Sequence, residues 1–233
     1  MTESGTSVAG LDGCRVGWVM VTVPTVTAGT PRIEVVTDLG LVTERLERGV
    51  LAAAAIDIPI GLPPDHPRPV DREARRRLGP RRSSVFPAPV RPVLAATSYT
   101  EACQISRAAS GRAVSRQLFA ILPKIREVDA LQSPARQDRL FEMHPEVSFA
   151  ELAGAPMQFH KSTRQGRAER LDALRRAFPE LSALADVRPR GTQPDDVLDA
   201  FVGAWTAQRF AAARHVRLGG ETDETGLRME IIV

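Results

Sequence analysis

The feature that most constrains the fold is an apolar run without alternation, LAAAAIDIPIGLP, from Leu51 to Pro63. A half-exposed strand alternates apolar and polar side chains, so this run predicts a strand that is buried on both faces. Proline and glycine end it, as expected at the end of a strand. One charged residue, Asp57, interrupts the run near its end.

The segments before this run predict the rest of a sheet. β-Branched runs at Ser7–Leu11 and Trp18–Val23 flank a short glycine-containing loop and predict a hairpin, which a third run at Arg32–Val36 extends. Helical spacing of apolar residues predicts a helix from about Asp38 to Arg48. This order places helices on a mixed sheet in which the buried run lies parallel to the first strand.

The remainder of the chain is mostly helical in pattern. We expect a short strand at Arg139–Met143 and a closing strand in GLRMEIIV. Helices are expected at about Val70–Leu78, at Thr100–Ser110 and at Ser115–Leu131, the last interrupted or kinked at Pro123. Further helices are expected to begin at Pro145, to lie in GRAERLDALRRAFPEL, and to run from Pro194 to about Arg214. With 43% hydrophobic and 25% charged residues, the chain can build a core. We expect one domain over residues 7–233, with an insertion at about 63–112.

The sequence also indicates in which compartment of the cell the protein is expected. The first ten residues, MTESGTSVAG, lack a basic segment followed by an apolar one, and no apolar run approaches the roughly 20 residues that span a bilayer. The two cysteines, Cys14 and Cys103, form no metal-ligand spacing and are too few for a disulfide framework. We therefore expect a cytoplasmic protein without a membrane partner.

Three aspartates occupy adjoining turns of the predicted helix in GTQPDDVLDAFVGAW, where they border its buried face. Asp195 and Asp196 have an ordinary explanation, because acids in a first turn favour the helix dipole. Asp199 lies one turn further in, where its acidic neighbours repel it. No lysine or arginine lies between Gly191 and Gln208, so a metal ion or a cation from elsewhere in the chain is required.

Asp12 and Asp57 lie at or near the carboxyl ends of two predicted neighbouring parallel strands, the edge where open α/β sheets bind ligands. Either residue alone would be explained as a turn former. Clustered carboxylates suit Mg²⁺ or Mn²⁺ better than zinc. Two such ions, roughly 4 Å apart, activate a water and stabilise the leaving oxygen of a phosphodiester, so the pattern predicts a two-metal-ion hydrolase.

Six ordered blocks, GLDGCRVGW, IDIPIGLP, VDREARRRLGPRRSSVFPAP, ILPKIREVD, FEMHPEVSF and DDVLDAF, carry a family resemblance. From about Val8 to Val233 the chain resembles the predicted RNase H-like nucleases called domain of unknown function 429. The resemblance implies an RNase H-like α/β fold, a mixed five-stranded sheet flanked by helices with an Arg/Pro-rich insertion after the fourth strand. It also implies catalytic and metal-binding roles for Asp12, Asp57, Asp196 and Asp199, with Asp195 as an alternative to Asp196.

The first helix departs from the pattern of ribonuclease H enzymes. The glutamate that those enzymes place there would have to be Glu44 or Glu47, and neither is distinctive. In resolvase-type relatives the final-helix acids lie three residues apart, as Asp196 and Asp199 do. The resemblance therefore favours a resolvase-like arrangement.

The block FEMHPEVSF permits two interpretations. His144 and Glu146 could serve as a general acid or base and an additional metal ligand, and we include Glu146 among the catalytic residues. Pro145 at a helix start with Glu146 just inside it is also sound capping chemistry. Lys124, in another block, is either a phosphate contact or one end of a solvated pair with Glu127.

The segment His66–Pro92 contains eight arginines and six prolines but only two acidic residues. These arginines could contact phosphates, with binding that weakens as salt rises, or could be exposed on a packed loop. Aromatic residues make up only 5% of the chain, which argues against a single-strand stacking platform and favours backbone recognition. We expect substrate contacts from Lys124, Arg75, Arg76, Arg81, Arg82 and His144.

These patterns suggest two function classes and argue against a third. The first is a Mg²⁺- or Mn²⁺-dependent nuclease or phosphodiesterase acting on DNA or RNA, in which a homodimer is conceivable because junction-cutting relatives are dimers. The second is a nucleic-acid-binding module of the same fold without turnover. The third, an actin-like ATPase or sugar kinase, needs two such domains around a nucleotide, and 233 residues are too few.

Overall fold

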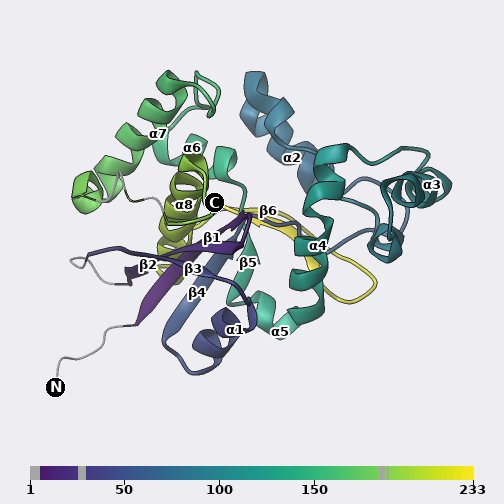
Figure 1. Cartoon of the computed structure of the whole chain (residues 1–233), viewed down its shortest axis with the longest axis horizontal. Helices are drawn as coiled ribbons and strands as arrows, with labels where there is room; N and C mark the ends of the chain where they lie inside the picture. The colour runs from purple at the N-terminus through teal and green to yellow at the C-terminus, as the bar shows by residue number, and fades with distance from the viewer. Residues whose placement is uncertain (1–5, 26–29, 184–186, 188) are drawn as a thin grey trace.

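The computed structural model describes residues 6–25, 30–183, 187 and 189–233. Five strands form one sheet in the order β3-β2-β1-β4-β5 (Figure 1). Their bounds are β1 Ser7–Cys14, β2 Gly17–Pro24, β3 Arg32–Val36, β4 Leu51–Ile56 and β5 Leu140–Glu142. β1, β4 and β5 are parallel, whereas β2 is antiparallel to both of its neighbours. The predicted α/β class with a mixed five-stranded sheet is confirmed, and it is consistent with an RNase H-like fold.

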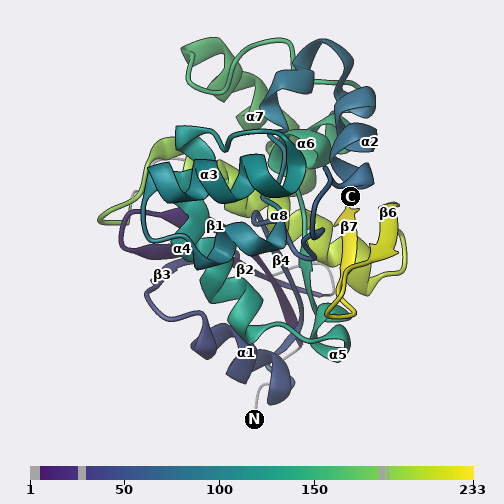
Figure 2. The same cartoon turned by 90° about the vertical axis from the view of Figure 1, so that its right-hand side faces the viewer.

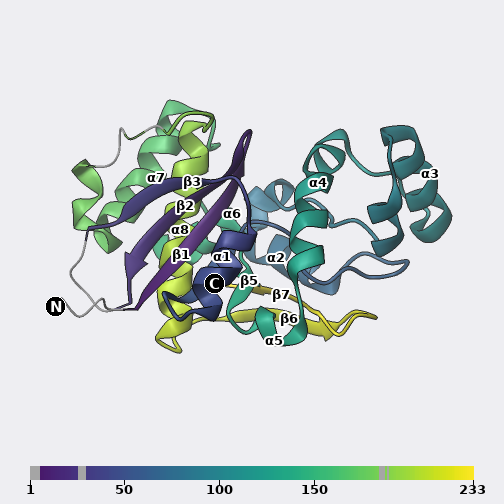
Figure 3. The ribbon, with the colours of Figure 1, turned by 60° about the horizontal axis from the view of Figure 1, so that its bottom comes forward.

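Helices cover both faces of the sheet (Figure 3). On one face, α8 (Pro194–Ala211) lies across β1, β4 and β2, and α6 (Pro145–Ala153) and α7 (Arg164–Ala177) pack beside it. On the other face, residues of α1 (Gly40–Glu47) and α4 (Arg116–Leu131) share a core with β1 and β4. This double coverage explains why the Leu51–Ile56 run shows no alternation.

A close approach between two glycines fixes the position of α8 on the sheet. A Cβ added at Gly10 of β1 would lie 2.0 Å from the backbone nitrogen of Ala204 and 2.1 Å from the carbonyl oxygen of Ala200. A Cβ added at Gly203 of α8 would lie 3.0 Å from the Cα of Gly10. Backbone therefore meets backbone here, which no larger side chain permits.

The insertion after β4 is more regular than its sequence predicts. It contains the two predicted helices, α2 (Pro69–Leu78) and α3 (Tyr99–Ser110), and also two short 3-10 helices, Gly79–Ser84 and Arg91–Ala95, that the sequence analysis does not predict. α4 (Arg116–Leu131) continues through Pro123, so the predicted interruption is wrong, and the alternative of a kink there stays a prediction. α3 lies at the end of the molecule away from β3 (Figures 1 and 3).

The C-terminal segment forms a second sheet, of which the sequence predicts only the last strand. β6 (Arg217–Thr222) pairs antiparallel with β7 (Arg228–Ile232), and this hairpin packs beside α2 (Figure 2). Glycines at 219 and 220 and a register shift obscure the pattern of β6. The short helices α5 (Pro134–Gln137) and η3 (Pro179–Ala183) complete the described elements. None of the described helices has both the length and the apolar character needed to cross a bilayer.

The glycine contact generates the first prediction. Gly10→Ala should lower the free energy of unfolding by about 3 kcal/mol, because α8 must move away from the sheet to admit a methyl group. Gly111→Ala is the control, since an added Cβ there meets nothing within 4 Å and the only cost is its φ of 72°, about 1 kcal/mol. Chemical denaturation measures both, and equal losses would contradict the close approach.

Candidate functional site

The register of β1 and β4 brings Asp12 and Asp57 together. Leu11 is the partner of Ile56 in the parallel ladder, and the amide of Asp57 donates to the Leu11 carbonyl at 3.1 Å. Side chains alternate along a strand, so Asp12 follows Gly10 on the face that α8 covers, and Asp57 follows Ala55 on the same face. The two carboxylates therefore lie side by side at the carboxyl edge of the sheet.

α8 presents its acids to this edge along one stripe. Asp196, Asp199 and Gly203 are three and four residues apart, which places them on the same side of a helix. Asp196 also caps α8, since one of its oxygens accepts from the Gln193 amide at 2.7 Å. Asp199 is completely buried. Asp196 lines the cavity at this edge, whereas Asp195 does not.

Lys161, which the sequence analysis does not assign to the site, supplies the cation that Asp199 requires. It lies between α6 and α7, and its Nζ is 2.7 Å from Asp199 Oδ2 and 3.7 Å from Asp195 Oδ2. Burial alone would lower the pKa of Lys161, but Asp199, Asp57 and Asp12 together raise it. The lysine therefore stays protonated among the acids. Two features of the sequence could have pointed to Lys161: Asp199 has no basic residue near it in the sequence, and lysines are scarce in the chain.

The acids shift one another's protonation. Burial raises the pKa of Asp57 to about 6, an effect that Lys161 opposes and Glu146 reinforces. Burial also raises the pKa of Asp199 to about 6, although Lys161 lowers it. Burial, followed by Asp199 and Asp57, holds the pKa of Asp12 well above its usual range. Lys161 and Lys124, the two lysines near these acids, supply fewer positive charges than the four aspartates supply negative ones. A further cation that bound here would displace protons.

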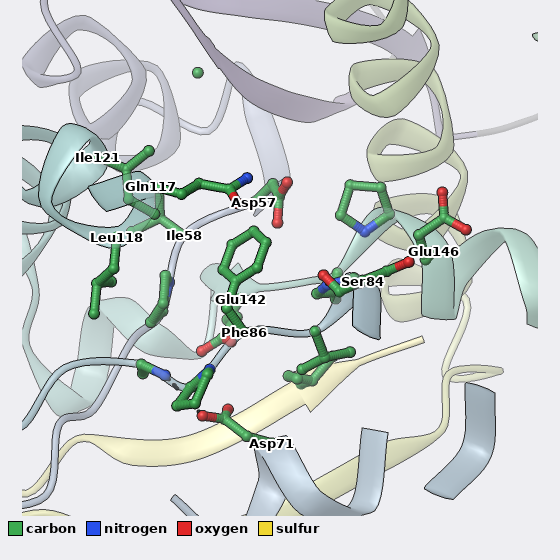
Figure 4. Close-up of a pocket in the computed structure, with 18 of the residues that line it drawn as sticks. Asp57, Ile58, Asp71, Ser84, Phe86, Gln117, Leu118, Ile121, Glu142 and Glu146 are labelled. Atoms are coloured by element: carbon green, nitrogen blue, oxygen red, sulfur yellow. Dashed lines mark hydrogen bonds between the residues drawn. The ribbon is translucent and has the colours of Figure 1, made fainter. Parts of the chain in front are cut away.

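A cavity of about 460 Å³ opens in front of these groups. Its volume is within the range of small-molecule sites. Figure 4 shows Asp57 and Glu146 at its rim together with residues of α4 and of the insertion. Its charged lining comes from widely separated parts of the chain and consists of Asp12, Asp57, Asp71, Glu142, Glu146, Asp196, Arg68, Arg81, Lys124 and Lys161.

The family model described as Protein of unknown function (DUF429) matches residues 10–224, nearly the whole chain. The chain belongs to this family. The matched range contains every residue that lines the cavity apart from Ile231. No curated protein and no solved structure matches the chain.

His144 and Glu146 of this DUF429 protein both line the cavity. His144 is the N-cap of α6 by position but makes no side-chain capping bond; its Nε2 lies 3.3 Å from the Ser84 carbonyl oxygen. A carbonyl only accepts, so Nε2 donates and Nδ1 keeps a lone pair, which is buried and has no hydrogen-bond partner. Burial lowers the pKa of His144, which keeps the ring neutral at pH 7. Glu146 forms a buried ion pair with Arg170 at 2.5 Å.

Lys124 is held at the cavity by aromatic and backbone contacts. Its Nζ donates to the Gly17 carbonyl at 2.5 Å and lies 4.3 Å from the centre of the Trp18 ring. Glu127 instead accepts from the Trp18 indole and the Leu39 amide. Burial lowers the pKa of Lys124, and the nearby acids only partly offset this effect. The geometry thus differs from a solvated Lys124–Glu127 pair, and it places Lys124 on the cavity wall, where its charge interacts with Asp12 and Asp196.

The arginines of the insertion separate into two groups. Arg75 donates to the Val85 carbonyl at 2.8 Å, so it braces the loop that follows α2. Arg81 lines the cavity, and its buried Nε has no hydrogen-bond partner. Arg76 and Arg82 are exposed. Of the four predicted substrate arginines, Arg81 therefore lines the cavity, whereas Arg76 and Arg82 face solvent.

A buried ion network that the sequence analysis misses anchors the insertion to the sheet. Arg68 is 2.7 Å from both Asp71 and Glu142, and all three side chains are buried. Glu142, at the end of β5, also accepts from the Ile60 amide at 2.7 Å. Burial raises the pKa of Glu142 to about 7, although Arg68 lowers it. This network forms part of the cavity wall.

The first-helix glutamates lie outside the site. Glu44 pairs with Arg48 at 3.1 Å and Glu47 with Arg136 at 2.9 Å, and both glutamate side chains are exposed. Neither residue lines the cavity. None of the acids that line the cavity therefore comes from α1.

The donor chemistry of the site suits a hard divalent cation. Carboxylate oxygens are the ligands that Mg²⁺ and Mn²⁺ prefer, and Asp199 Oδ1 and Glu146 Oε2 are buried without a hydrogen-bond partner. Within the part of the chain that the structure describes, no three His, Cys, Asp or Glu side chains form a ready-made metal group.

The Lys161–Asp199 pair generates the second prediction. Lys161→Met should lower the free energy of unfolding by about 2 kcal/mol, because it leaves a buried carboxylate without its cation. Adding Asp199→Asn to this variant should recover most of the loss. Arg175→Met, which removes an exposed pair with Asp172, is the control and should cost under about 0.5 kcal/mol. Denaturant titration measures the free energy of unfolding of each variant. If Lys161→Met does not lower it, the pairing of Lys161 with Asp199 is contradicted.

Proposed function

We propose that this protein is a metal-dependent phosphodiesterase that hydrolyses nucleic acid, DNA or RNA. One observation carries the proposal: carboxylates from β1, the end of β4 and α8 meet the ammonium groups of Lys124 and Lys161 in a single cavity. Acids for a metal and cations for a phosphate are the two sets of groups that phosphodiester hydrolysis needs. Such a site lies where α/β sheets bind their ligands.

Asp12, Asp57 and Asp196 are the residues that would hold Mg²⁺ or Mn²⁺, and Asp199 would join them through its free Oδ1. When bound, the metal supplies Lewis-acid activation of water and charge stabilisation at phosphorus. The raised pKa values of Asp57 and Asp199 fit this assignment, because carboxylates arranged to hold a cation repel one another without it.

The remaining cavity residues would hold the substrate and move its protons. Lys124 and Lys161 would contact non-bridging phosphate oxygens, and Arg81 would add a planar donor through its unpartnered Nε. His144, neutral and with a free Nδ1, is suited to accept a proton from the attacking water. Arg170 fixes Glu146, so that Glu146 Oε2 faces the site from a rigid position.

A second candidate, a nucleic-acid-binding module without turnover, is favoured by two observations. Lys161 already neutralises Asp199, and no three-donor metal group is present among the described residues. In this case the acids and Lys161 would stabilise the fold, and the exposed Arg76 and Arg82 would contact phosphates. Binding would then fall with salt and yield no product with any divalent ion.

The third prediction separates these candidates. Labelled single-stranded and duplex DNA and RNA, and a four-way junction, are incubated with the protein and Mg²⁺ or Mn²⁺. Asp12→Asn should reduce the cleavage rate by about 100-fold or more, since it removes a charge at the reacting centre. Glu44→Gln, which removes an exposed acid from α1, should cleave as the natural chain does. Unchanged cleavage by Asp12→Asn would refute the assignment, and binding without cleavage would favour the second candidate.

A further inference from the structure

The cavity has an apolar half that phosphate chemistry leaves unexplained. Beside the acids, its wall is formed by Ile58, Phe86, Leu118 and Ile121. Figure 4 shows Gln117, Leu118 and Ile121 of α4 on one side of the Phe86 ring. An ion or a bare phosphate gains nothing from such a wall. The occupant must therefore carry an apolar surface as well as a negative charge.

Phe86 is the most informative residue of this wall. It follows the 3-10 helix Gly79–Ser84, and 37% of its surface is exposed even though it lies in a concave site. The ring therefore offers an exposed aromatic face inside the pocket, on which a planar group can stack. Stacking a nucleobase on an aromatic ring is favourable and tolerates any base.

The polar groups around the apolar wall suit the edge of a base and its phosphate. Gln117, exposed in the first turn of α4, carries both a donor and an acceptor, the pairing that base edges use. Lys124, Lys161 and Arg81 lie in the same cavity and supply the positive charge. A cavity of about 460 Å³ accommodates a small molecule and is far too small for a duplex.

We infer that the cavity binds one unstacked nucleotide, with its base on Phe86, its base edge at Gln117 and its phosphate toward Lys124 and Lys161. This inference rests on the proposed function and narrows its substrate. The base must leave its stack to enter, so the preferred substrates are single strands, frayed ends or duplexes with an extruded base. A low aromatic content is compatible with this inference, because one ring serves one base.

Binding of mononucleotides tests the inference without cleavage, since they contain no phosphodiester bond. Calorimetry with Mg²⁺ compares the four nucleoside 5′-monophosphates with 2-deoxyribose 5-phosphate. The nucleotides should bind about tenfold more tightly than the sugar phosphate. Phe86→Ala should abolish this difference, and Phe86→Leu, which keeps the apolar volume, should reduce it. Phe159→Ala is the matched control, because Phe159 is also exposed, at 43%, but does not line the cavity.

The outcomes separate this inference from the proposed function. Equal binding of nucleotide and sugar phosphate, or no nucleotide binding up to millimolar concentration, would overturn the nucleotide pocket even where Asp12-dependent cleavage is observed. Phe86-dependent nucleotide binding in a protein that cleaves nothing would support the pocket and reject the hydrolase. Removal of the base from the nucleotide next to the cut should also slow cleavage of an oligonucleotide about tenfold. An abasic substrate cut at the full rate would count against the inference.

Discussion

The contact of Gly10 with α8 is the constraint from which the arrangement of the site follows. Two residues further along β1, on the same face, lies Asp12, and one turn before Gly203 along α8 lies Asp199. A side chain at the glycine contact would push the helix from the sheet and separate these carboxylates. Because the two glycines let α8 lie close to β1, they also bring the carboxylates of Asp12 and Asp199 close together. The packing of the helix and the geometry of the site therefore depend on the same contact.

That cluster is costly for the fold to maintain. Burial raises the pKa of Asp12, Asp57 and Asp199, so ionising each carboxyl group costs more free energy in this cluster than in water. Lys161 compensates for only part of this repulsion. A protein that retains such an arrangement gives up stability at a place where a ligand can restore it, which is typical of functional sites. The Arg68–Glu142 network differs, because its charges satisfy one another within the wall.

Much of the sheet could be predicted because its signals are local. The unalternating run at Leu51–Ile56, the preceding hairpin and the strand-end positions of Asp12 and Asp57 all follow from neighbouring residues. Lys161 could not be placed, since its partner Asp199 is 38 positions away and the turn that holds it has no periodicity. The ion pair of Arg68 with Glu142 spans 74 positions and was hidden among the other arginines. The same applies to Phe86, whose exposure in a cavity depends on how the insertion folds back.

The central claim, that the acids of β1, β4 and α8 form one divalent-cation site, is tested most directly by calorimetric titration with Mn²⁺. At about pH 7.5 the protein should bind the ion and release protons, because carboxylates with raised pKa values are held ionised by the metal. At about pH 5, below the pKa of about 6 of Asp57 and Asp199, binding should weaken as protons compete for the same oxygens. Asp12→Asn should lose binding and Glu44→Gln should keep it. Absence of binding at millimolar Mn²⁺, or equal binding by Asp12→Asn, would contradict the account.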